Sequence, residues 1–120
     1  MNATACLLTR ADVYAEIGGL NEGRLAVAFN DVDYCLRLRE RGYLVTWTPY
    51  AEFYHLESAS RGDDMASDKV GRFRGERAFL AERWATVLPH DPYYNPNLSC
   101  YEGLFQLGED TRTRRPWRQR

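Results

Sequence analysis

The sequence predicts an α/β fold with a small mixed sheet, two main helices and an extended C-terminal segment. Two stretches, 30–41 and 67–88, carry apolar residues at helical spacing. Three short runs are rich in the apolar, aromatic and β-branched residues that are typical of strands: 3–10, 43–50 and 51–58. The segment 90–107 is punctuated by prolines and lacks a helical period, which favours an extended chain.

Glycine and proline mark the ends of the predicted helices. In "RADVYAEIGGL", one or two helical turns are stopped by Gly18 and Gly19. Gly42 closes the helix at 30–41. Pro89 is expected to end the longest helix, whose apolar positions are Val70, Phe73, Leu80, Trp84 and Leu88.

Composition and charge narrow the class of protein. The 120 residues suit one domain, with 44% hydrophobic side chains and a formal net charge of -1. This balance argues against a general nucleic-acid-binding protein, although the predicted solvated tail 107–120 holds five arginines. Cys6, Cys35 and Cys100 form no CxxC pair, so neither a zinc site nor a disulfide framework is indicated, and reduced thiols in a cytoplasmic protein are expected. The early apolar run "ACLL" is too short for a signal peptide or a membrane span.

The segment "FNDVDYCLRLRERGY" places two carboxylates at the start of a predicted helix. A structural interpretation explains both. Asn30 is a good N-cap, and Asp33 stands at the capping-box position and pairs with Arg37 one turn on. The functional interpretation is that Asp31 accepts a proton, which requires its side chain to face a cleft. Spacing alone favours the structural interpretation, and the functional one stays open.

Three segments, in order, carry a family resemblance: "CLLTRADVYAEIGGLNE", "FNDVDYCLRLRERGY" and "TPYAEFYHLESASRG". With "DPYYNPNLS" further on, the chain resembles the C-terminal half of the catalytic domain of family-two glycosyltransferases of the GT-A fold, of the bacterial surface-polysaccharide type. The likeness covers residues 4–62. It implies that 1–106 is the acceptor-side part of such a domain, with a partial GT-A-like fold, and that 107–120 is a basic tail.

The resemblance also implies roles for individual residues. Asp31 matches the general base that takes the proton from an acceptor hydroxyl as that oxygen attacks the sugar, with inversion. His55 matches a histidine that helps to hold a divalent metal, Mg²⁺ or Mn²⁺; a histidine packed on an apolar strand face is the alternative. Acceptor or phosphate binding is expected from a polar and aromatic set: Asn30, Trp47, Ser58, Ser60 and Arg61.

The donor-binding half of such an enzyme is not recognisable in the sequence. No βαβ unit and no Asp-x-Asp metal motif precede Asp31, so the 120 residues alone are expected neither to transfer sugar nor to bind the metal. In a full-length parent, the partners would be a nucleotide-sugar donor and a glycan acceptor, in the cytoplasm or at the inner face of the membrane. Strand edges left exposed would favour homo-oligomers. The alternative function is a non-catalytic interaction or oligomerisation module derived from such an enzyme.

Overall fold

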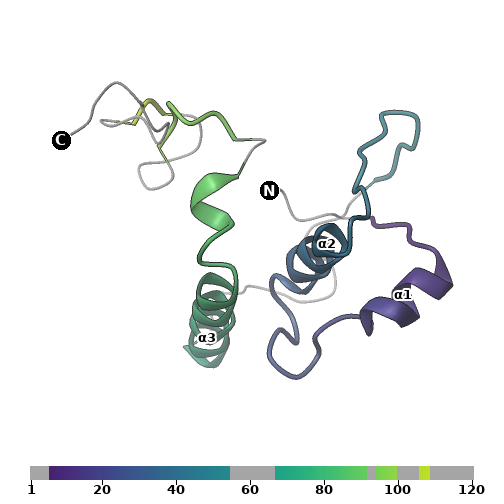
Figure 1. Ribbon diagram of the computed structural model, residues 1–120. Helices are drawn as coiled ribbons and strands as arrows, with labels where there is room; N and C mark the ends of the chain where they lie inside the picture. The colour runs from purple at the N-terminus through teal and green to yellow at the C-terminus, as the bar shows by residue number, and fades with distance from the viewer. Residues whose placement is uncertain (1–5, 55–66, 92–93, 100–105, 109–120) are drawn as a thin grey trace. The chain divides into compact units, whose positions relative to one another are not determined.

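Helices make up the regular structure of the residues that the computed structural model describes, which are 6–54, 67–91, 94–99 and 106–108 (Figure 1). They are α1 (Ala11–Ile17), α2 (Asn30–Glu40), α3 (Ser67–Arg83) and the short 3-10 helix η1 (Leu88–His90). The chain divides into two compact units, Asn2–Arg83 and Trp84–Arg120 with Met1.

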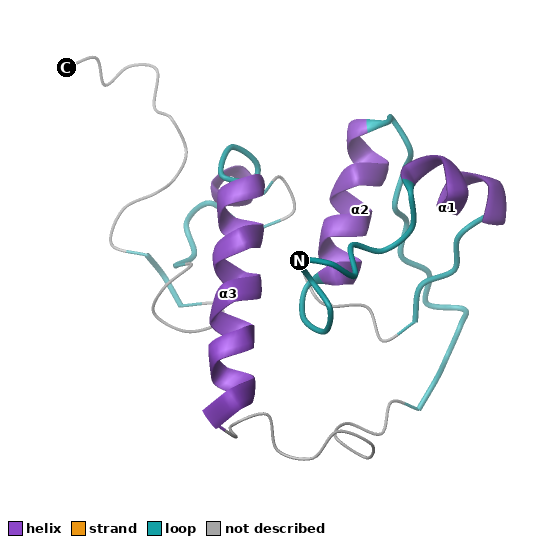
Figure 2. Ribbon diagram, turned by 90° about the horizontal axis from the view of Figure 1, so that it is seen from below, coloured by secondary structure: helices purple, strands orange, loops and turns teal. Residues whose placement is uncertain are grey.

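The predicted α/β fold with a small mixed sheet is wrong for these residues, which form no strand (Figure 2). A strand needs a neighbour to pair its backbone N–H and C=O groups, and the described parts of the three apolar runs form no ladder with one another. Several of their large side chains lie in water instead: Leu8 is 96% exposed, Trp47 84% and Tyr54 100%. An isolated antiparallel bridge joins Leu98 to Leu107.

The ends of α1 and α2 follow the local sequence signals. Gly18 ends α1 with φ 85°, in the left-handed region that glycine adopts without strain, and its N–H donates to the carbonyl of Ala15 at 3.1 Å. Residue Asn30 begins α2 as predicted, and the helix ends at Glu40, just before Gly42 with φ 84°. Both helices are therefore placed correctly by signals within one turn of their ends.

The predicted end of the longest helix at Leu88 is wrong, because α3 ends at Arg83. A turn follows, in which the carbonyl of Trp84 accepts the N–H of Val87 at 3.0 Å and that of Leu88 at 2.9 Å. Pro89, expected to stop the helix, lies inside η1. Among the helices of the described chain, none is both long and apolar enough to cross a membrane.

The core of the first unit lies between α1 and α2, which run side by side in Figures 1 and 2. Its centre is fully buried Tyr34, whose ring centroid lies 5.5 Å from that of Tyr14. The Tyr34 hydroxyl is 3.0 Å from Oγ1 of Thr9, which satisfies the one polar group of this buried ring. Other apolar side chains complete the cluster: Val13, Leu38, Leu7, Ile17, Leu20, Tyr43 and Val45. The segment before α1 thus packs on α2 although it is not a strand.

The second unit contains η1 and, after it, backbone hydrogen bonds around the isolated bridge. The N–H of Ser99 donates to the carbonyl of Gln106 at 2.7 Å, and the N–H of Gly108 donates to that of Asn97 at 2.9 Å. The hydroxyl of Tyr94 donates to the carbonyl of Ser99 at 2.8 Å. These contacts tie together the described parts of the segment that the prolines predicted to be extended.

Candidate functional site

The candidate site is built around the turn that precedes α2. Phe29 is the N-cap of α2 and has φ 64° and ψ 7°, a left-handed conformation that a bulky side chain rarely adopts. Its carbonyl accepts the N–H of Asp33 at 3.0 Å, which starts the helix. Asn30, the predicted N-cap, is instead the first helical residue, because the chain turns one residue earlier. A left-handed backbone costs an L-residue about 1–2 kcal/mol, so neighbouring contacts have to hold the turn.

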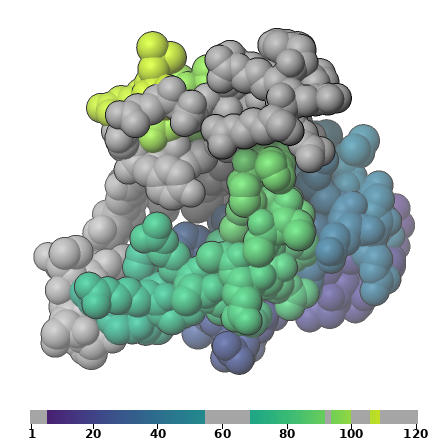
Figure 3. Space-filling view, turned by 60° about the vertical axis from the view of Figure 1, so that its left-hand side comes forward, coloured from purple at the N-terminus to yellow at the C-terminus, as the bar shows by residue number. Residues whose placement is uncertain are grey.

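Glu76 of α3 holds the chain just before Phe29. Its Oε1 accepts the N–H of Val27 at 3.2 Å and its Oε2 accepts the N–H of Ala28 at 2.8 Å. Phe73, one turn earlier on α3, packs on Phe29 with ring centroids 5.3 Å apart. Glu76 is 5% exposed, whereas the outward side of α3, teal to green in Figure 3, is open to solvent. Two charge-assisted hydrogen bonds thus satisfy a carboxylate that has little contact with water.

Asp33 is a buried structural residue. Its Oδ2 accepts a hydrogen bond from Nε of Arg37 at 2.8 Å, and its Oδ1 lies 3.2 Å from Nε of Arg83. Arg37 also donates to the carbonyls of Ile17 at 2.9 Å and Gly19 at 2.6 Å. The predicted pair of Asp33 with Arg37 is confirmed. It lies in the interior, however, where it links the end of α1 to α2 and, through Arg83, to α3.

Asp31 occupies a different environment in the first turn of α2. It is half-buried, and its Oδ1 accepts the N–H of Val32 at 2.9 Å. One turn on, burial raises the pKa of the Cys35 thiol, and the negative charge of Asp31 raises it further. The Asp31 carboxylate therefore lies at the boundary between interior and solvent. Its role as a proton acceptor stays a prediction.

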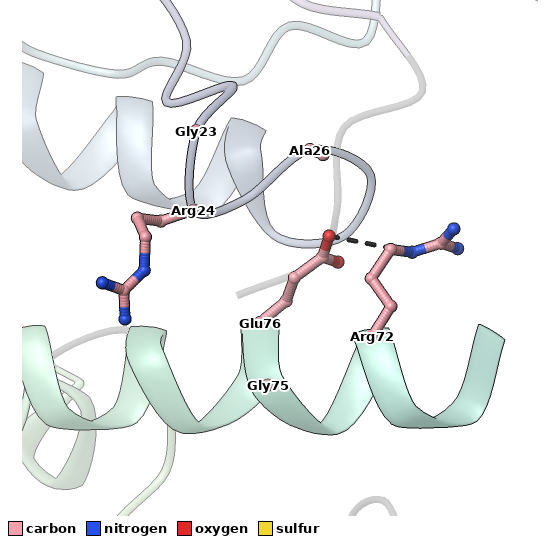
Figure 4. Close-up of a pocket in the computed structure, with 6 residues that line it drawn as sticks. All are labelled: Gly23, Arg24, Ala26, Arg72, Gly75 and Glu76. Carbon is pink, nitrogen blue, oxygen red and sulfur yellow. Dashed lines mark ion pairs between the residues drawn. The ribbon is translucent and has the colours of Figure 1, made fainter. Parts of the chain in front are cut away.

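An open pocket of about 320 Å³ lies between α3 and the loop before α2, lined by Gly23, Arg24, Ala26, Arg72, Gly75 and Glu76 (Figure 4). In Figure 4 the Glu76 carboxylate points toward the loop, with the side chains of Arg24 and Arg72 on either side. Nε of Arg72 is 3.8 Å from Oε1 of Glu76, and the guanidinium of Arg24 is 4.7 Å from the ring centroid of Phe79. Guanidinium groups of this kind suit phosphate oxygens.

The structure describes three of the seven residues that the sequence predicted for the site. Asn30 and Asp31 are adjacent and half-buried in the first turn of α2, whereas Trp47 is largely exposed. The other four lie outside the described residues: His55, Ser58, Ser60 and Arg61. The acceptor- or phosphate-binding roles of Ser58, Ser60 and Arg61 therefore stay predictions.

Sequence reasoning missed two charged residues of α3 that reach the start of α2, Glu76 and Arg83. A signal was present for the first. Glu76 is three residues after Phe73 and four before Leu80, so it falls on the predicted apolar stripe of its helix. A charged residue on such a stripe indicates a buried partner elsewhere in the chain. No comparable signal identified Val27 and Ala28 as the partners.

The described residues do not fit the divalent metal that the resemblance implies. Among them, no group of three or more His, Cys, Asp and Glu side chains is placed to hold an ion. Both oxygens of Asp33 face guanidinium groups, and hard divalent ions need several oxygen ligands. The metal-binding role of His55 stays a prediction.

Comparison with known proteins identifies relatives from bacteria. The chain is 48% identical over 103 residues to y4gI, an uncharacterized protein of Sinorhizobium fredii, and the match covers 86% of this chain and 11% of that protein. It is 35% identical over 98 residues to the O-antigen biosynthesis protein RfbC of Myxococcus xanthus, covering 80% of this chain and 7% of RfbC. No family model matches, and no solved structure does.

A third relative carries the name of a sugar-transferring enzyme. The chain is 35% identical over 79 residues to N-acetylglucosaminyl-diphospho-decaprenol L-rhamnosyltransferase of Mycobacterium tuberculosis, and the match covers 66% of this chain and 25% of that enzyme. This chain thus spans a quarter or less of each of these relatives. Sequence similarity thus confirms the predicted relationship of this chain to glycosyltransferases.

Proposed function

We propose that this chain is the acceptor-side part of an inverting family-two glycosyltransferase in which Asp31 is the general base. The observation that carries the proposal is the contrast between two carboxylates of one motif. Asp33 is buried between Arg37 and Arg83, whereas Asp31 lies half-buried at the helix start. The relative named as a rhamnosyltransferase supports the reaction class.

The proposed reaction joins a sugar to an acceptor hydroxyl. The hydroxyl oxygen attacks the anomeric carbon of a nucleotide-sugar donor, a new C–O bond forms, and the bond to the nucleotide diphosphate breaks with its electron pair. Asp31 takes the proton that the hydroxyl loses. Attack from the face opposite the leaving group inverts the anomeric centre. A sugar on a lipid diphosphate, the acceptor in the name of the M. tuberculosis relative, is the first acceptor to test.

The donor-binding part, and the metal where transfer uses one, are proposed to come from residues beyond those described. Positioning two substrates supplies a large share of the rate enhancement of a transferase, so the acceptor side alone is not sufficient. The 120-residue chain, mixed with nucleotide sugars, Mg²⁺ or Mn²⁺ and acceptors, should therefore yield no product by mass spectrometry. Measurable turnover would show that it holds a complete site.

The role of Asp31 is tested in a transferase that contains this segment together with a donor-binding part. Asp31→Asn removes the proton acceptor but keeps the size of the side chain, so turnover should fall by about 10²–10⁴-fold. Donor affinity, measured by calorimetry, should stay unchanged, because the base acts on the acceptor. Asp12→Asn, at an exposed position of α1, is the control and should keep full turnover. Equal losses of turnover and donor affinity in the Asp31 variant would make Asp31 a structural residue.

The alternative, a non-catalytic interaction module, is favoured by one observation. Large apolar side chains are exposed along a short segment after α2: Leu44, Trp47, Tyr50, Phe53 and Tyr54. In such a module this surface would bind another protein or a second copy. Sedimentation velocity on the chain and on a Trp47→Ser, Tyr50→Ser, Phe53→Ser variant separates the two functions. Concentration-dependent association that the variant loses, together with absent transfer in any longer protein, would favour the module.

A further inference from the structure

We propose that Glu76 is a positioning residue for Asp31, acting through the left-handed turn at Phe29. The inference rests on the proposed function of Asp31. Phe29 stands two residues before Asp31, and its φ of 64° is the one positive φ of a non-glycine residue in the described chain. A strained residue at this place persists because its surroundings hold it, and such residues are concentrated at functional sites.

The contacts that hold the turn come from one helix. Glu76 accepts the consecutive N–H groups of Val27 and Ala28 with separate carboxylate oxygens, at 3.2 and 2.8 Å. A carboxylate in this bidentate arrangement orients the peptide plane between the two residues. These two hydrogen bonds also fix the direction in which the backbone enters Phe29. Phe73 packs on the Phe29 ring.

The same helix also holds the chain after Asp31. Arg83 reaches the buried carboxylate of Asp33, so α3 contacts residues on both sides of Asp31 in the sequence. A general base has to lie within about 2.6–3.2 Å of the hydroxyl that it deprotonates. A misplacement of about 1 Å, even from a change far from the chemistry, can cost about 10²-fold in rate. The position of Asp31 therefore depends on contacts that it does not make itself.

The first experiment tests the contact in the 120-residue chain. Glu76→Gln keeps the shape of the side chain but turns an amide NH₂ toward one of the two backbone N–H groups. Hydrogen exchange at Val27 and Ala28, followed by NMR, should become at least about tenfold faster, because opening of the turn becomes easier. The matched control is Glu82→Gln, at an exposed position of α3, and its exchange at these amides should be unchanged. Equal exchange in both variants would overturn the inference.

The second experiment tests the consequence for the reaction, in a transferase that contains this segment. Glu76→Gln should lower kcat by about 10–10²-fold, with the KM for the donor unchanged and the Glu82→Gln control at full activity. Phe29→Gly separates positioning from general stability, because glycine adopts φ 64° without strain. In the Phe29→Gly background, the additional loss from Glu76→Gln should shrink to about threefold or less, since little strain remains for Glu76 to hold.

Three outcomes distinguish failure of this inference from failure of the proposed function. If Asp31→Asn abolishes transfer but Glu76→Gln leaves kcat unchanged, the base stands and the positioning role is overturned. If Glu76→Gln lowers kcat by the same factor with and without Phe29→Gly, Glu76 contributes only general stability and the inference fails. If Asp31→Asn leaves transfer intact, the proposed function fails, and the positioning role fails with it.

Discussion

Arg83, the last residue of α3, lies 3.2 Å from the buried carboxylate of Asp33 in α2. The same carboxylate accepts a hydrogen bond from Arg37, which in turn donates to two carbonyls at the end of α1, those of Ile17 and Gly19. One acidic side chain thus joins the three helices of the described part of the first unit. Its neighbour in the motif, Asp31, is half-buried rather than fully buried, and this difference in burial is the basis of the catalytic proposal.

Removal of the buried charge should destabilise the protein. Asp33→Asn leaves Arg37 and Arg83 without their carboxylate partner, and breaking a buried ion pair in this way costs about 3–5 kcal/mol. We expect about 3 kcal/mol, the lower end of that range, because the Arg83 side chain is partly exposed to water. Urea denaturation followed by circular dichroism measures the loss.

The control for this prediction is the exposed pair of Arg10 with Asp12. Asp12→Asn makes the same chemical change in α1, where solvent surrounds both partners, and no measurable change in stability is expected. A loss for Asp33→Asn no larger than that of the control would contradict the structural role of Asp33.

The pKa of Cys35 predicts how the two described cysteines react. Burial, and secondarily the charge of Asp31, raise the pKa of the Cys35 thiol, so less thiolate forms at pH 8, and the buried sulfur is also hard to reach. Iodoacetamide should modify exposed Cys6 first, as measured by mass spectrometry of the separate peptides. The folded protein favours the neutral thiol of Cys35 over the thiolate. The stability that this preference contributes is lost as the pH rises through the folded-state pKa of Cys35.

The same reaction tests the proximity of Asp31 to Cys35. Asp31→Asn removes a negative charge that disfavours the thiolate, so the pKa of Cys35 should fall and its alkylation rate should rise. Asp12→Asn should leave that rate unchanged. An alkylation rate that does not respond to the charge at position 31 would mean that the two side chains lie further apart than the structure shows.

Two glycine substitutions should change stability in opposite directions. Gly18 has φ 85° and open space around its absent Cβ, so Gly18→Ala should cost about 1–2 kcal/mol through backbone strain alone. Gly71 lies inside α3 and also has open space, so Gly71→Ala should stabilise the protein by about 0.5–1 kcal/mol. Thermal unfolding of both variants measures the difference. A stabilising Gly18→Ala would show that the left-handed end of α1 is absent in solution.

Parts of the structure were predictable because their causes lie within one helical turn. Gly18 and Gly42 marked the ends of α1 and α2, and the spacing of Asp33 and Arg37 predicted their ion pair. The sheet was wrongly predicted for the opposite reason. Apolar runs such as 43–50 have the composition of strands, but a strand exists only where another strand pairs with its backbone.

The sequence by itself determined where α1 and α2 lie, which acidic residues begin α2, and the relationship to sugar-transferring enzymes. Only the tertiary structure decided that Asp33 is buried between two arginines, that Asp31 stays at the surface boundary, and that Glu76 holds the turn at Phe29. The physical reason is the range of the interactions. Caps and i,i+4 pairs join residues that are close in the sequence, whereas Glu76 and Arg83 meet their partners only when α3 packs against the start of α2.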